Sequence, residues 1–72
     1  MSDEPTLYKL LQVDSEAEPT IIRYAYRHLA GKYHPDAPGG SKELFRKVTD
    51  AFRVLSNPES RAAYDKTLHE GK

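Results

Sequence analysis

The sequence predicts an all-α domain built on a hairpin of two antiparallel helices. Two segments, 19–33 and 42–55, repeat apolar residues at the three- and four-residue spacing of an amphipathic helix. Between them stands Ala37-Pro38-Gly39-Gly40-Ser41, which cannot continue a helix and is too short for a wide excursion. No stretch shows the strict alternation of a β-strand. We therefore expect the two helices to pack apolar face against apolar face, flanked by a short first and a short fourth helix.

The first short helix is predicted to begin after Thr6. The Thr6 hydroxyl can accept a hydrogen bond from the first helical turn, as N-cap residues do. Leu7, Leu10 and Leu11 then recur at the spacing of one helical face. The polar run 14–18 reads as the connection to the next helix.

The second helix is predicted over 19–33. Pro19 suits its first position, where a missing N–H costs nothing, and Glu18 would be the N-cap. Arg23 and Arg27 lie four residues apart and flank the apolar face. The helix should end before Pro35, because a residue that precedes proline is disfavoured in the α conformation. The apolar face consists of Ile22, Ala25, Tyr26, Leu29 and Tyr33.

The third helix is predicted over 42–55, with Ser41 as its N-cap. Its apolar stripe consists of Leu44, Phe45, Val48, Ala51, Phe52 and Leu55. A fourth, short helix is predicted over 59–65. Either Asn57 caps it with Pro58 at the first helical position, or Ser56 and Glu59 form a capping box. We expect Ala62, Ala63 and Tyr64 to supply its packing.

Length and composition indicate one small globular domain. The chain has 72 residues, of which 38% are hydrophobic and 31% charged. We expect the ordered domain to span 6–66, with 1–5 and 67–72 as flexible termini. The chain has no cysteine, so neither a disulfide nor a cysteine zinc site can stabilise it. It also has no apolar run of membrane-spanning length and no signal peptide, so a cytoplasmic location is expected.

The charge is balanced overall but segregated along the chain. Eleven basic residues offset eleven acidic ones, yet 19–33 contains three basic residues and no acidic one. A neutral domain with one basic helix suits an acidic protein surface. A nucleic-acid-binding domain more often carries an overall basic excess.

The connection between the two long helices begins with His34-Pro35-Asp36. As a bare tripeptide this would be an ordinary turn, where proline and aspartate are common. A His–Asp catalytic pair is disfavoured, because no nucleophile is evident and a helix tip offers little concave shelter from water. A metal site of His28, His34, Asp36 and His69 is disfavoured because their spacing fits no ligand pattern.

The motifs along the chain closely resemble those of the J domain, the module shared by DnaJ-type co-chaperones. The resemblance covers about residues 6–66. Its motifs are Leu7-Tyr8-Lys9-Leu10-Leu11-Gln12-Val13, Ile22-Arg23-Tyr24-Ala25-Tyr26-Arg27-His28-Leu29-Ala30, Lys32-Tyr33-His34-Pro35-Asp36, Phe45, Ala51-Phe52-Arg53-Val54-Leu55-Ser56-Asn57-Pro58 and Arg61-Ala62-Ala63-Tyr64-Asp65.

The resemblance implies a partner and a set of contacts. A J domain binds a DnaK-type (seventy-kilodalton heat-shock) chaperone in its ATP state and stimulates ATP hydrolysis, without a cofactor or catalytic residue of its own. His34, Pro35 and Asp36 would form the essential signature, and the chain would act as a monomer. The contact face on the second helix would consist of Arg23, Tyr26, Arg27 and Lys32, with Phe45 as an apolar contact from the third helix.

The chain departs from the family pattern at four positions. Family members often carry basic residues where Tyr24, His28 and Ala37 stand, and a larger apolar residue in place of Gly31. The contact face is therefore less positive than usual, which bears on which DnaK-type partner it prefers. Two other interpretations are weighed against this one: a small helical nucleic-acid-binding domain, and a J domain that serves only as an interaction scaffold.

Overall fold

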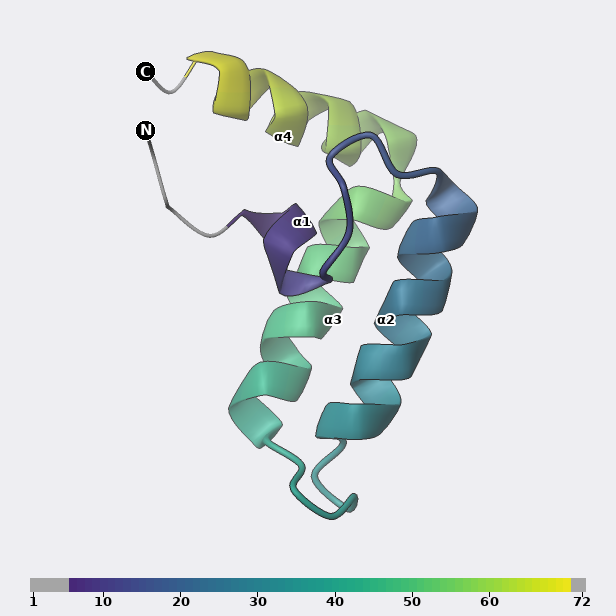
Figure 1. Ribbon diagram of the computed structural model, residues 1–72. Helices are drawn as coiled ribbons and strands as arrows, with labels where there is room; N and C mark the ends of the chain where they lie inside the picture. The colour runs from purple at the N-terminus through teal and green to yellow at the C-terminus, as the bar shows by residue number, and fades with distance from the viewer. Residues whose placement is uncertain (1–5, 71–72) are drawn as a thin grey trace.

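A computed structural model describes residues 6–70, and the side chains of residues 6–68 within that range. Its four helices are α1 (Leu7–Leu10), α2 (Pro19–Tyr33), α3 (Lys42–Ser56) and α4 (Pro58–Glu70). Helices α2 and α3 run side by side in opposite directions, and α1 packs on α3 (Figure 1). The predicted all-α fold with its central antiparallel pair is confirmed. No helix within the described range is long and apolar enough to cross a membrane.

The ends of the two long helices follow from short sequence signals. Helix α2 begins at Pro19 and ends at Tyr33, as predicted, although the Glu18 side chain makes no capping hydrogen bond. Ser41 caps α3, with its hydroxyl accepting from the Leu44 N–H at 3.1 Å. Pro35 follows the end of α2 and Ser41 caps the start of α3, so these residues set the length of the connection 34–41 and the direction in which it leaves α2.

The two shorter helices were predicted less completely. Thr6 caps α1 as expected, accepting from the Lys9 N–H at 3.2 Å. Asn57 caps α4 through its side-chain oxygen, so the alternative capping box with Ser56 does not form. The prediction that the fourth helix ends at residue 65 is wrong, because α4 continues to Glu70. Residues 1–5 and 71–72, part of the predicted flexible termini, lie outside the described residues.

The core lies between α2 and α3, on the side where α1 packs on α3. Its buried side chains are Tyr8, Leu11, Ile22, Leu29, Val48, Ala51 and Leu55. Leu44, predicted as part of the apolar stripe of α3, is instead 38% exposed, because it lies at the first turn, beyond the region that α1 covers. Ala62 and Ala63 are also exposed, and of the three predicted packing residues of α4 only Tyr64 reaches the core.

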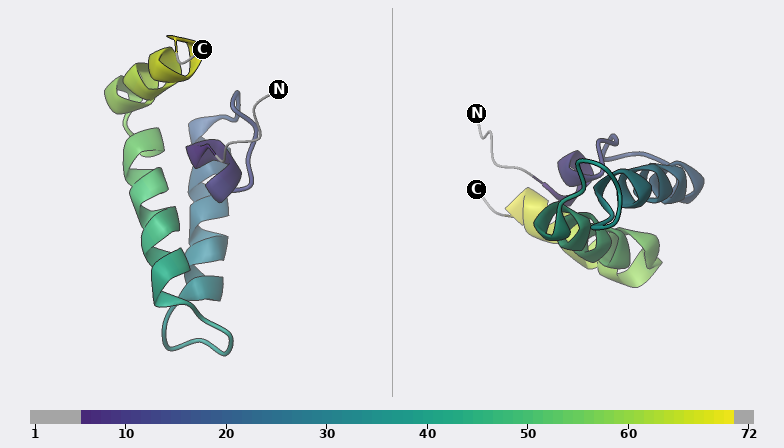
Figure 2. Two further views of the ribbon diagram at one scale, coloured as in Figure 1. Left: turned by 90° about the vertical axis from the view of Figure 1, so that its left-hand side faces the viewer. Right: turned by 90° about the horizontal axis from the view of Figure 1, so that it is seen from below.

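A polar network centred on Tyr8 attaches α4 to the start of the chain. The buried Tyr8 hydroxyl donates to the Asp65 carboxylate at 2.6 Å and accepts from the Arg61 guanidinium at 3.0 Å. Arg61 also donates to the Ala17 carbonyl at 2.7 Å, just before α2 begins. Burial, followed by the hydrogen bond to Asp65, raises the pKa of the Tyr8 phenol above its usual 10.0. This network places α4 at the end of the hairpin opposite the connection 34–41 (Figure 2).

Candidate functional site

The connection between α2 and α3 is a compact loop closed by its own backbone. The Ser41 N–H donates to the Tyr33 carbonyl at 2.9 Å, so the end of α2 is joined to the start of α3. Within the loop, the Ala37 N–H donates to the His34 carbonyl at 2.8 Å, and the Gly40 N–H donates to the Ala37 carbonyl at 2.9 Å. These bonds hold the first residues of the loop in a defined conformation at the tip of the hairpin.

The two glycines of the loop are required for different reasons. Gly39 has φ +75°, in the left-handed region that other residues rarely adopt. A Cβ on Gly40 would overlap the carbonyl group of His34. Gly40 thus allows the loop backbone to pass directly over His34. The sequence indicated only that the run 37–41 cannot continue a helix.

His34 and Asp36 are both presented to solvent. Their side chains are 50% and 92% exposed, and Pro35 between them restricts the backbone. The His34 Nδ1 accepts a hydrogen bond from the Asp36 N–H at 3.1 Å, and the His34 ring lies edge-to-face with the Phe45 ring, with centroids 5.4 Å apart. The contact with Phe45 was not foreseen from the sequence, because it joins two helices across the loop.

The predicted contact residues of α2 are divided between two sides of the helix. Arg23 and Arg27 are exposed and separated by one turn. Successive residues of an α-helix are rotated by about 100° around its axis. The Cα of Lys32, nine residues after Arg23, therefore lies on the opposite side of α2. The Lys32 ammonium lies 5.8 Å from the Tyr33 ring centroid. Helix geometry applied to the sequence alone would have revealed this division.

Tyr26 connects the arginine side of α2 to α3. Its half-buried ring stacks on Phe52, with centroids 4.3 Å apart and planes at 11°. Its hydroxyl lies 3.4 Å from the Thr49 hydroxyl, which donates to the Phe45 carbonyl at 2.8 Å. The structure therefore brings Arg23, Tyr26 and Arg27 onto the side of the hairpin that also carries Phe45.

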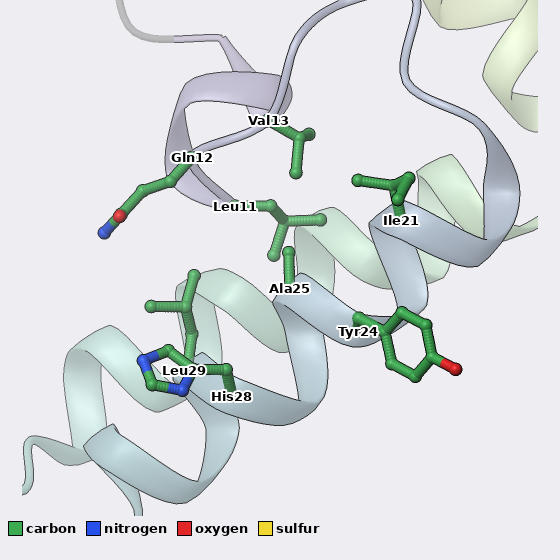
Figure 3. Close-up of a pocket in the computed structure, with 8 residues that line it drawn as sticks. All are labelled: Leu11, Gln12, Val13, Ile21, Tyr24, Ala25, His28 and Leu29. Atoms are coloured by element: carbon green, nitrogen blue, oxygen red, sulfur yellow. The ribbon is translucent and has the colours of Figure 1, made fainter.

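An open apolar groove lies on the other side of α2, beside the connection from α1. Leu11 and Val13 face Ala25 across it, whereas the Gln12 side chain points away (Figure 3). Tyr24, also at this groove, is 62% exposed.

Within the part of the chain that the structure describes, no three histidine or acidic side chains gather closely enough to hold an ion. The His69 side chain, one of the four ligands weighed from the sequence, lies outside the described side chains.

The sequence was compared with models of known protein families. The model of the DnaJ domain matches residues 6–65, most of the chain. The chain belongs to the DnaJ domain family. A J domain is a non-catalytic co-chaperone module, and family members generally stimulate the ATPase of DnaK-type chaperones.

The J domain is shared with much longer relatives. It is 51% identical over 67 residues to the chaperone protein DnaJ of Wolbachia sp. subsp. Brugia malayi, covering 89% of this chain and 18% of that protein. It is 44% identical over 66 residues to the chaperone protein DnaJ of Methanosarcina thermophila, covering 89% of this chain and 17% of that protein. A curved DNA-binding protein of Pseudomonas syringae pv. tomato is 43% identical over 67 residues, covering 90% of this chain and 21% of that protein. The chain thus spans about a fifth of these relatives' length.

Proposed function

We propose that this J domain binds a DnaK-type chaperone in its ATP-bound state, stimulates its ATP hydrolysis and so couples the chaperone to client-protein folding. The observation that carries the proposal is the intact His34-Pro35-Asp36 sequence, exposed at the tip of the α2–α3 hairpin. An activator must bind one state of its partner better than another. A restrained tip with a directional hydrogen-bonding group and a carboxylate is suited to that discrimination.

The basic side chains of α2 support an electrostatic contribution to encounter. Residues 19–33 contain no acidic residue, and Arg23 and Arg27 project from the side that Tyr26 connects to α3. Such charges steer a complementary acidic surface and raise the association rate, an effect that salt screens. We propose Arg23, Tyr26 and Arg27 as the main contacts on α2, with Lys32 reaching the partner only from the edge of that surface.

The test is single-turnover ATP hydrolysis by DnaK-type chaperones, with the wild-type domain and with His34→Gln and Asp36→Asn. We expect wild type to accelerate hydrolysis and each variant to lose about tenfold or more, the size of one charge-assisted or directional hydrogen bond. Glu59→Gln is the matched control: it neutralises an exposed carboxylate at the start of α4, at the other end of the hairpin. Absence of acceleration by wild type with several partners would refute the proposal.

The relative whose name includes DNA binding motivates one alternative. In that protein the matching segment is 21% of the length, and the same segment occurs in relatives named as chaperones. The net charge of zero disfavours binding to duplex DNA. A band shift of duplex DNA at physiological salt, together with no effect on chaperone ATPase, would favour the alternative. A scaffold without activator function predicts binding to the chaperone with no acceleration.

A further inference from the structure

The His34 ring is held from two sides, although it stands at an exposed tip. On one side it packs edge-to-face on Phe45, with ring centroids 5.4 Å apart and planes at 74°. Phe45 is half-buried in the first turn of α3, beyond the Ser41 cap. Edge-to-face packing is a favoured arrangement of aromatic rings, and it restricts rotation of the ring. The contact therefore links the orientation of His34 to the start of α3.

On the other side, the loop backbone selects the tautomer of the neutral ring. The Asp36 N–H donates to the His34 Nδ1 at 3.1 Å, so Nδ1 acts as the acceptor. A neutral imidazole carries one donor and one acceptor nitrogen, so in the neutral form of His34 the proton resides on Nε2. Nε2 is the ring nitrogen farther from the backbone, on a side chain that is half exposed.

The same nitrogen cannot serve a His34–Asp36 ion pair at the same time. The Asp36 Oδ2 lies 3.9 Å from His34 Nδ1, and an ion pair would need a proton on that nitrogen. Such a proton would displace the hydrogen bond from the Asp36 N–H. Because the hydrogen bond is shorter and directional, the loop favours the tautomer of the neutral ring in which Nδ1 accepts from the Asp36 N–H.

We infer that Phe45 is a positioning residue for His34, and that the loop holds Nδ1 as an acceptor, so that the Nε2–H is offered as a donor to a carbonyl or carboxylate oxygen of the partner. The inference rests on the proposed function. It assigns Phe45 an action through His34, whereas the resemblance to J domains implied an apolar contact with the partner. A donor aligned before binding loses less conformational entropy when the complex forms.

The first test is spectroscopic and uses the isolated 72-residue chain without a partner. In mildly alkaline buffer, nitrogen-15 spectra should show His34 Nδ1 as the unprotonated nitrogen, with a scalar coupling to the Asp36 amide across the hydrogen bond. In Phe45→Leu the ring-current displacement of the His34 protons should disappear. Phe45→Tyr should keep the displacement, and so should Leu44→Ala, which removes an exposed apolar side chain one residue away.

The second test asks whether Phe45 acts through His34. In single-turnover hydrolysis, Phe45→Leu should raise the domain concentration for half-maximal stimulation by about fivefold, the ratio expected for one aromatic pair, and Phe45→Tyr should restore it. In the His34→Gln background, Phe45→Leu should add almost nothing, because a residue that acts through another has no further effect once that one is lost. Circular dichroism of each variant checks folding.

The outcomes separate this inference from the proposed function. A proton on His34 Nδ1, or His34 resonances that do not move in Phe45→Leu, would overturn the inference whatever the ATPase assay shows. An equal effect of Phe45→Leu in the wild-type and His34→Gln backgrounds would also overturn it, since Phe45 would then contact the partner directly. Wild-type domain without any stimulation, but with the expected spectra, would instead refute the proposed function.

Discussion

At the scale of single residues, the tip depends on a glycine that lies outside the His-Pro-Asp sequence. In Gly40→Ala the new Cβ would overlap the His34 carbonyl group, so the loop must shift. We expect a loss of about 1–3 kcal/mol in stability, as for other overpacked sites, together with most of the ATPase stimulation. Urea unfolding and single-turnover hydrolysis measure the two effects.

The chain contains a matched control for that substitution. An added Cβ at Gly31, which is exposed in α2, meets nothing within 4 Å. Gly31→Ala should therefore stabilise the helix by up to about 1 kcal/mol and leave ATPase stimulation unchanged. Equal loss of activity in both variants would show that the tip does not depend on the close approach of Gly40.

Tyr8 makes stability depend on pH in the alkaline range. Its folded-state pKa is raised above 10.0, chiefly by burial and then by the hydrogen bond to Asp65. Folding thus favours the protonated phenol, so this stabilisation is fully present below the unfolded pKa and is lost as pH rises through the folded pKa. We expect the urea midpoint of wild type to fall more steeply above pH about 10 than that of Tyr8→Phe. Parallel profiles of the two proteins would contradict the assignment.

At the scale of elements, the division of α2 into two sides leads to a paired charge-reversal test. Arg27→Glu and Lys32→Glu make the same change of charge on the two sides of one helix. We expect Arg27→Glu to lower the association rate with a DnaK-type chaperone by about tenfold or more at low salt, and Lys32→Glu to lower it less. The difference should shrink as ionic strength rises, because salt screens exposed charges.

Stopped-flow association at several salt concentrations measures both rates. Equal slowing by the two variants would mean that only the net charge of α2 matters, and would remove the case for a contact side. Rates of wild type that do not change with salt would contradict the electrostatic account as a whole.

How well the limits of each helix could be predicted depended on whether particular residues mark its ends. Helix α2 was predicted to the residue because Pro19 and Pro35 fix its limits by covalent geometry. The end of α4 was missed because the polar residues after Asp65 are compatible with an exposed helix, and no proline or glycine follows before Gly71. Polarity predicts exposure of a segment and does not by itself end a helix.

The site was predictable in its residues and only partly in its geometry. The sequence placed His34, Pro35 and Asp36 at a helix tip because Pro35 and the following glycines exclude helix there. The contact of His34 with Phe45 and the passage of Gly40 over His34 depend on how the loop folds, which no local pattern encodes. The Tyr8 network was missed for a similar reason, because it joins residues more than fifty positions apart.

At the scale of the whole molecule, the tip and the core occupy different parts of the hairpin. The buried residues gather between α2 and α3, on the side where α1 packs on α3, and His34 is not among them. Function and stability should therefore respond to different substitutions. The free energy of unfolding of a small domain is only about 0.05–0.15 kcal/mol per residue. A core substitution therefore changes it by a large fraction, which equilibrium unfolding can measure.

We expect His34→Gln to lower the free energy of unfolding by only about 1 kcal/mol, the low end for the loss of one aromatic contact and one loop hydrogen bond, because the ring is half exposed. Leu29→Ala, by contrast, empties a site that is 3% exposed and should cost about 2–5 kcal/mol. The two variants should affect stability and activity in opposite ways. His34→Gln should keep its melting transition and lose ATPase stimulation. Any Leu29→Ala domain that remains folded should keep the tip and its ATPase stimulation. A large stability loss in His34→Gln would instead show that the Phe45 contact helps to hold α2 and α3 together. ATPase stimulation by the tip and folding of the hairpin would then be coupled.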